Sequence, residues 1–449
     1  MKKISILSIT FCISVSSMQV HAENDNTKPL NLLDVYMLAK GQDAQFAAAE
    51  AALRAGKEVL PQSRAALKPS LRLDGNTRYI DQTTKYSGNV PFPSGTQSYG
   101  SYHYTLKLIQ PIYHKNSIEA YKQARLSVES SETQFNLAQQ NLITRVAQAY
   151  FDVLLAKDTL TLTEAEISSN EEQLARSKRA FDIGSATIMD VREAQASYDL
   201  SRAREISAKN GLEIARQTLS KIIGTYPQAL VSIAGELPLV PPEPAIMENW
   251  VTAAQEQNLN VRLAQLNLQI AGREIQRNRG LAYPSLDLVA NYIGNNSSSS
   301  SYGAGVNTKE KNIGLELNVP LYSGGLVSSK TRELVAEKER SQHIWDDTRR
   351  QAELQTQNAY LSVTSDILQI QALQQAVASS ESSLEATRRG FDLGLRTEID
   401  VLTAQQQLFS AKRDLASAKY DYLTSRLKLQ AAVGTLSEKD LLAINELLK

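Results

Sequence analysis

The sequence has almost no cysteine. Its one cysteine, Cys12, lies within a stretch that we expect to be removed, and it lacks the preceding Leu-small-small pattern of a lipoprotein cleavage site. A mature chain without cysteine forms no disulfide, no thiolate metal site and no cysteine nucleophile. We therefore expect neither a disulfide framework nor an N-terminal lipid anchor.

Long hydrophobic runs and net charge are also missing. After residue 22, no stretch approaches the roughly 20 apolar residues of a membrane-spanning helix. The 449 residues include 48 basic and 48 acidic side chains, and 46 and 48 after residues 1–22 are removed. This balance leaves no basic excess for a nucleic-acid partner.

Sequence motifs for catalysis or cofactor binding are absent too. The four histidines, His21, His103, His114 and His343, are too far apart to suggest a metal site. Neither a G-x-S-x-G nor a P-loop pattern occurs. We therefore predict no catalytic residue, no metal and no cofactor, so the chain is not expected to be an enzyme.

The first 22 residues have the features of a secretory signal. Lys2 and Lys3 precede a mostly apolar stretch, and Ala22 supplies a small residue at the expected cleavage point. The sequence therefore predicts a protein that is exported from the cytoplasm.

The rest of the chain is an internal duplication. Residues 179–184 (RAFDIG) recur as residues 389–394 (RGFDLG), an offset of 210, and Pro111-Ile112-Tyr113 recurs as Pro320-Leu321-Tyr322. Such self-similarity indicates a repeated structural unit. We divide the chain into a signal peptide (1–22), a first repeat (23–224), a proline-rich linker (225–245), a second repeat (246–434) and a C-terminal segment (435–449).

Four segments alternate apolar and polar residues with a period of two, as β-strands do. They are residues 70–80, 101–113, 285–293 and 312–322. The pattern alone fits an ordinary sheet packed on helices as well as membrane strands, but the signal peptide and long polar loops favour a membrane. Because four strands cannot close a membrane barrel, several chains would have to share one.

The remaining segments of each repeat predict helices. They are residues 31–65 and 246–280, the long segments 115–181 and 326–391, and the returning segments 188–223 and 398–433. The long segments show coiled-coil-like spacing and, at 1.5 Å per residue, would extend roughly 100 Å. That length far exceeds a membrane, so these helices are expected to project from it.

With these features the chain resembles the TolC family of outer-membrane efflux and secretion factors. The most specific matches are residues 320–325 (PLYSGG), the two hairpin turns, and Gly434-Thr435-Leu436 followed by Asp440-Leu441-Leu442. The last segment resembles the branch of the family without a lipid anchor. The resemblance implies a mainly helical fold with membrane β-structure: three chains would share a twelve-stranded outer-membrane β-barrel that continues into a twelve-helix periplasmic α-barrel.

The resemblance also implies partners and a cellular place. The protein would be a homotrimer in the lipid of a Gram-negative outer membrane, extending through the periplasm. A periplasmic adaptor and an inner-membrane transporter of the ABC or RND type would dock at its tip, for type I protein secretion or drug efflux. The alternatives are a trimeric adhesin or structural stalk, which needs no constriction, and a passive porin, which needs no long helices.

The family closes its tunnel at the hairpin tips, and the matching positions here form a candidate gate. They are Met189, Asp190, Phe391, Arg396 and Asp400. We predict that Arg396 pairs with Asp190 to hold the tips inward, since a charge-assisted bond is directional and breakable. A ring of Asp400 carboxylates would favour cations, and repulsion between them would raise their proton affinity.

Three positions depart from the family pattern. Phe391 stands in place of a tyrosine, Met189 in place of a threonine and Thr403 in place of a second aspartate. The gate is therefore expected to have fewer polar ties and to depend more on packing. A simpler interpretation treats Asp190 and Asp400 as helix-capping residues only, which suits acids at a helix start.

Overall fold

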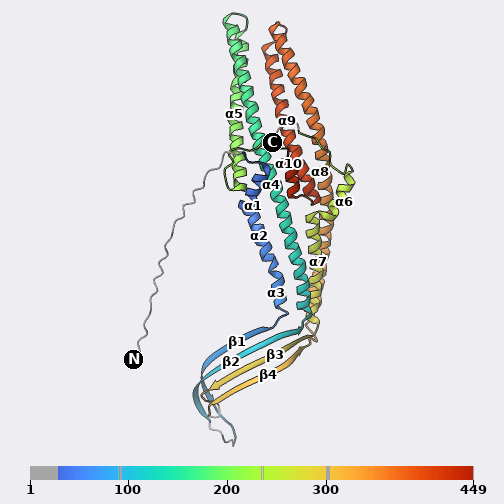
Figure 1. Cartoon of the computed structure of the whole chain (residues 1–449). Helices are drawn as coiled ribbons and strands as arrows, with labels where there is room; N and C mark the ends of the chain where they lie inside the picture. The colour runs from blue at the N-terminus through green and yellow to red at the C-terminus, as the bar shows by residue number, and fades with distance from the viewer. Residues whose placement is uncertain are drawn as a thin grey trace, which may run out of the picture.

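The computed structural model describes residues 29–88, 91, 94–233, 235, 237–299 and 304–447 (Figure 1). The expected signal peptide and its cysteine lie outside these described residues. One end of the molecule is a curved sheet, and the other consists of two long helical hairpins whose tips point away from the sheet (Figure 1). Shorter helices lie against the hairpins about halfway along them.

Each half of the chain begins with short helices. In the first half these are α1 (Leu32–Gln42), α2 (Ala44–Lys57) and α3 (Val59–Ala65), and in the second half α6 (Met247–Gln257) and α7 (Leu259–Arg279), which runs into the short 3-10 helix η1 (Gly280–Ala282). The sequence predicted one helical segment in each place. Asp43 and Asn258 divide these segments, because each caps the next helix with its side-chain oxygen.

The long hairpins repeat in both halves. Helix α4 (Lys115–Asp182) returns as α5 (Ile188–Ile223), and α8 (Leu326–Asp392) returns as α9 (Glu398–Val433). A short helix, α10 (Glu438–Asn445), follows. Gly224 and Gly434 end the returning helices in the left-handed conformation that glycine adopts without strain.

The four strands form one antiparallel sheet in the order β1-β2-β3-β4. They are β1 (Ser70–Thr84), β2 (Gly95–Tyr113), β3 (Ser285–Ser297) and β4 (Val306–Asn318). Three of them reach further into the connecting loops than the predicted ranges, and β4 begins and ends earlier. Within the described residues β1 and β4 each pair on one side only, so both edges of the sheet have free backbone groups.

Register gives the sheet a continuous apolar face. Leu71 lies opposite Leu108, Leu108 opposite Ala290, and Ala290 opposite Ile313. Leu71 and Ile313 are 67% and 74% exposed in the single chain, which is unusual for large apolar side chains in water. On the same sheet, Gly294 leaves room for the ring of Tyr104, which an added Cβ would meet at 2.1 Å.

The main core lies where the short helices and the linker pack on the hairpins. Tyr150 of α4 is buried, and its hydroxyl donates to the carbonyls of Val231 (2.6 Å) and Leu30 (3.3 Å). Its counterpart in the second repeat, Tyr360, donates to the carbonyl of Ala245 (2.6 Å). Equivalent tyrosines thus fix both ends of the linker, as expected from the duplication.

In the described part of the chain, no helix combines the length and apolarity needed to cross a membrane. The prediction of a mainly helical, duplicated chain with four antiparallel strands is confirmed.

Candidate functional site at the hairpin tips

The two hairpin tips have the same backbone. Gly184 and Gly394 adopt positive φ values of 79° and 72°, which allow the chain to reverse just after α4 and α8. The next amide then donates to a carbonyl of the last helical turn, Ser185 to Ala180 and Leu395 to Gly390, at 2.8 Å in both tips. The duplicated sequence therefore builds two equivalent turns at the same end of the molecule (Figure 1).

A capping box begins each returning helix. Thr187 and Thr397 are the N-caps, and the Asp190 and Asp400 amides bond to their hydroxyls at 3.3 Å. Each aspartate accepts the backbone amide of its threonine in return, at 2.7 and 2.9 Å. Both acids therefore take part in capping, but they occupy the third helical position and a threonine is the cap.

These bonds lower the pKa of Asp400 below its usual value of 3.8. The backbone bond to Thr397 contributes most, the hydroxyl bond adds to it, and the positive charge of Arg396 acts in the same direction. Within one chain Asp400 therefore carries a negative charge at neutral pH. The predicted rise in proton affinity concerns three such carboxylates brought together on the axis of a trimer.

The structure places the other candidate residues at the tips but in different environments. Met189 is 61% exposed, and Arg396 is exposed as well. Phe391 is partly buried against a small cluster that contains Leu384 and Val401. Phe391 therefore packs within its own hairpin. Among the salt bridges between described residues there is none that joins Arg396 to Asp190.

The second tip differs from the first in one arginine. Arg396 occupies the position of Ala186, and Gly390 that of Ala180. An added Cβ at Gly390 would lie 2.9 Å from Cγ of Arg396, so the glycine makes space for the arginine stem. The second turn therefore has a basic side chain next to Asp400, at a position where the first turn has an alanine.

Behind the tips, a buried polar seam joins the hairpins. We use this name for Thr163, Glu166, Asn170, Gln173 and Ser177 of α4, all of them buried. They recur at alternating steps of three and four, the spacing that places side chains on one stripe of a helix in a coiled coil. The stripe is polar here, although such positions are usually apolar.

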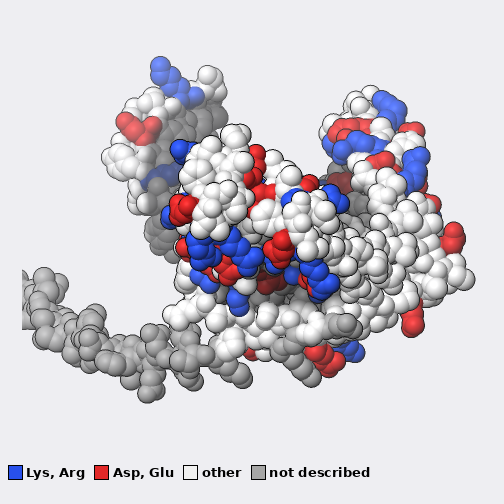
Figure 2. All heavy atoms as spheres, turned by 90° about the horizontal axis from the view of Figure 1, so that it is seen from above, with Lys and Arg blue, Asp and Glu red and all other residues white. Residues whose placement is uncertain are grey.

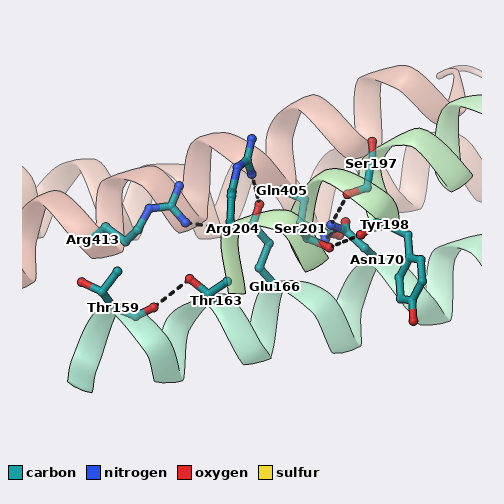
Figure 3. Close-up of polar contacts among 10 residues, drawn as sticks. All are labelled: Thr159, Thr163, Glu166, Asn170, Ser197, Tyr198, Ser201, Arg204, Gln405 and Arg413. Atoms are coloured by element: carbon teal, nitrogen blue, oxygen red, sulfur yellow. Dashed lines mark hydrogen bonds and ion pairs between the residues drawn. The ribbon is translucent and has the colours of Figure 1, made fainter. Parts of the chain in front are cut away.

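Glu166 is the charged centre of the seam (Figure 3). Its carboxylate accepts a bond from Arg204 of α5 at 2.7 Å and another from Arg413 of α9 at 2.9 Å. Its side chain is 4% exposed, whereas those of the arginines are 42% and 26% exposed. One buried carboxylate thus ties its own hairpin together and connects it to the other hairpin.

Further contacts extend the seam toward the tips. Gln405 donates to Asn170 at 2.7 Å, and Asn170 donates to the Ser197 carbonyl at 3.3 Å (Figure 3). Nearer the tip, Glu398 of α9 is buried and accepts bonds from Gln173 (2.5 Å) and Ser177 (2.9 Å). The seam therefore reaches the first turn of the helix that carries Asp400.

Sequence reasoning missed the seam. The sequence signal for the seam is the spacing of polar residues by three and four positions from Thr163 to Ser177. The coiled-coil pattern used to predict buried positions is defined by apolar residues, so it does not detect this stripe. The partners, Arg413 and Glu398, lie more than two hundred positions away, and their pairing depends on how the hairpins pack.

The arrangement can hold and release helices, and it offers no reaction chemistry. No set of three histidine, cysteine, aspartate or glutamate side chains in the described residues could hold a metal ion. Seen from the hairpin end, basic and acidic side chains are interspersed, and neither sign dominates this face (Figure 2). Such a surface does not provide the basic face that a nucleic acid requires.

Comparison with known proteins agrees with this architecture. A family model described as "Outer membrane efflux protein" matches residues 35–225 and 250–435. The outer membrane protein TolC of Vibrio cholerae is 32% identical over all of this chain and 99% of that protein. The alkaline protease secretion protein AprF of Pseudomonas aeruginosa is 33% identical over 92% of this chain and 86% of that protein.

A solved structure has the same fold at lower sequence identity. A crystal structure of CusC matches 90% of this chain and 92% of that one, with a TM-score of 0.77 and 18% identity.

Proposed function

Since this chain belongs to the outer membrane efflux protein family, we propose that three copies of it form one gated export duct. The protein is an outer-membrane efflux or secretion channel, it extends from the outer membrane into the periplasm, and it is not an enzyme. The number of copies, the docking partners and the gate are parts of our proposal.

The observation that carries the proposal is the open, apolar sheet. Its edges β1 and β4 have free backbone groups, and one face exposes leucine and isoleucine. In lipid such edges must pair, since unpaired amides and carbonyls there cost several kcal/mol each. Three four-stranded sheets joined β4 to β1 would give a closed barrel of twelve strands, with the apolar face toward lipid.

The hairpins support the same assembly. Leu354, Leu361 and Leu368 of α8 are exposed at steps of seven, the spacing of a coiled-coil seam. On the first hairpin, α5 exposes Leu200, Ile206 and Ile214. These apolar side chains are exposed in one chain and would be buried where the α8 side of one copy meets the α5 side of the next.

We place the gate at the hairpin tips. Both hydrogen bonds that the Asp190 carboxylate accepts from the described residues end on Oδ2, which leaves Oδ1 as an acceptor. In the closed trimer Arg396 would bond this oxygen, and three Asp400 carboxylates would face the axis and favour cations. Phe391 and Met189 would contribute packing in place of polar ties.

We propose that a periplasmic adaptor and an inner-membrane transporter of the ABC or RND type dock at these tips. Because AprF is named for protease secretion, we propose protein export of type I, with an ABC transporter, as one use of this duct. The cargo would cross the periplasm inside the helices without release.

Single-channel conductance in planar bilayers tests the gate, with wild type, Arg396→Ala and Arg389→Ala compared as purified trimers. Arg389 is a matched control, because it is an exposed arginine of the same hairpin that pairs with Glu385 of its own helix. We expect a small resting conductance that rises clearly in Arg396→Ala and stays unchanged in Arg389→Ala. A large conductance equal in all three would refute Arg396 as a latch, and a folded trimer without any channel would refute the duct.

A further inference from the structure

A basic groove lies over α7, between α4 and α8, near the sheet end of the helices. It has a volume of about 890 Å³. Its charged lining residues are Lys122, Arg125, Glu129, Arg273 and Lys338. Four basic side chains against one acid make the lining of this groove cationic, in a chain whose basic and acidic side chains balance as a whole.

A buried carboxylate holds part of the groove in place. Glu119 is 3% exposed and accepts bonds from Lys122 at 2.9 Å and Arg273 at 3.4 Å. Burial raises its pKa, but the bonds from Lys122 and Lys115 outweigh burial and leave the pKa below its usual value. Glu119 is therefore ionised at neutral pH and orients its partners. Gly272 leaves open space in the lining of the groove, because the only atom near an added Cβ there would be Cε of Lys338, at 4.0 Å.

Two of the basic groups form no salt bridge with any of the described residues. Among the salt bridges between described residues, Lys122 and Arg273 pair with Glu119, and none involves Arg125 or Lys338. Two unneutralised cations that flank one groove attract an anion, and Arg125 offers the planar fork that binds phosphate oxygens in pairs.

The helical repeat shows which way the groove faces. Lys122 and Glu129 precede Tyr150 by 28 and 21 residues, and because a straight helix drifts by about 20° per heptad, they lie about 80° and 60° from Tyr150 around α4, on the same side of the helix. Tyr150 points at the segments around Leu30 and Val231, which lie against the hairpins. In the proposed duct those segments must be outside, because they would block a passage. The groove therefore opens on the outer surface of the duct.

The groove also lies close to the membrane. At 1.5 Å per residue, Lys122 is about 10 Å and Lys338 about 18 Å beyond the sheet-proximal starts of α4 and α8. Between sheet and helices the chain exposes Leu281 and Tyr283, a leucine and a tyrosine suited to a membrane boundary. Long basic side chains reach from such positions toward lipid headgroups.

From these observations we propose that the groove binds the phosphate headgroup of an anionic phospholipid of the inner leaflet of the outer membrane. Arg125 and Lys338 contact the phosphate, while Glu119 holds Lys122 and Arg273 toward it. The lipid thereby fixes the depth of the duct in the membrane. The orientation of the groove depends on the proposed duct, and its chemistry does not.

Native mass spectrometry of the full-length trimer, released from nanodiscs of phosphatidylglycerol in phosphatidylcholine, tests the site. The variants are Arg125→Gln with Lys338→Gln, and a control with Lys178→Gln and Arg202→Gln, which are exposed cations far from the sheet. Wild type and control should retain one phosphatidylglycerol per chain. The groove variant should bind it about 30-fold more weakly, as expected for the loss of two basic contacts. If the double variant does not fold, Lys338→Gln alone should weaken binding about fivefold.

Equal retention in wild type and groove variant would overturn the proposal. So would displacement of the lipid by millimolar inorganic phosphate, which would identify a soluble phosphate as the ligand. Conductance of the same preparations separates this inference from the duct itself: the groove variant should conduct like wild type, and a loss of the lipid site leaves the channel proposal intact.

Discussion

Replacing Glu166 by glutamine should loosen the contact between the two hairpins. The side chain keeps its size but loses its charge, so both bonds, to Arg204 and to Arg413, become weaker. The bond to Arg413 joins the hairpins, whereas the bond to Arg204 lies within one of them. The predicted consequence is a duct that opens more readily at rest.

The magnitude follows from burial. A hydrogen bond to a charged group contributes about 1.5–3 kcal/mol, and breaking a buried ion pair costs about 3–5 kcal/mol. Both arginines are partly exposed, so water replaces much of what is lost. We expect about 1 kcal/mol per chain for the contact with Arg413, which increases the population of separated hairpins about fivefold.

The assay is the opening frequency of single channels, recorded together with the thermal midpoint of the trimer. Glu164→Gln is the control, since Glu164 is exposed on the same helix, two residues away. Glu166→Gln should open about five times as often and melt at a lower temperature. If both variants behave like wild type, the seam does not couple the hairpins.

Further substitutions test other parts of the structure. Tyr150→Phe should lower the free energy of unfolding by about 1 kcal/mol, because the Val231 carbonyl loses the hydroxyl donor while the Leu30 carbonyl keeps the amide of Val231, and thermal melting measures it. Gly294→Ala should destabilise the barrel by about 1–3 kcal/mol through overpacking against Tyr104. Gly314→Ala, with open space at its Cβ, should not destabilise it, and the temperature at which each variant unfolds measures the difference. The bonds from Lys40 and Tyr36 lower the pKa of Glu438 below 4.5. The stability lost in Glu438→Gln should therefore be constant above pH 4.5 and disappear as the pH falls through that lowered pKa, in melting curves recorded against pH.

Much of the fold could be predicted because the residues that begin and end its helices lie next to those helices in the sequence. The range 188–223 begins after the threonine of a capping box and ends at a glycine, and both signals are readable without the structure. The start of β2 was harder to predict from the sequence. Residues 95–100 are rich in glycine and small polar residues, and they become a strand because β1 pairs with them.

The candidate site was predictable to a smaller extent. The positions of Asp190 and Asp400 at the tips follow from the turn and the capping pattern. The position of Phe391 on its own hairpin depends on packing with Val401, and the partners of Glu166 come from two other helices, α5 and α9. Such contacts depend on how the helices pack, which a pattern along one helix does not contain.

The polar seam has a consequence for repeated use of the duct. An apolar interface that parts in water exposes surface that aggregates and costs free energy with every square ångström. The seam instead exposes carboxylate, amide and hydroxyl groups, which water solvates at once. The proposed separation of the hairpins could therefore be repeated many times without exposing apolar surface that aggregates. In the proposed gate, the apolar core around Tyr150 would stay closed and act as the pivot of the movement.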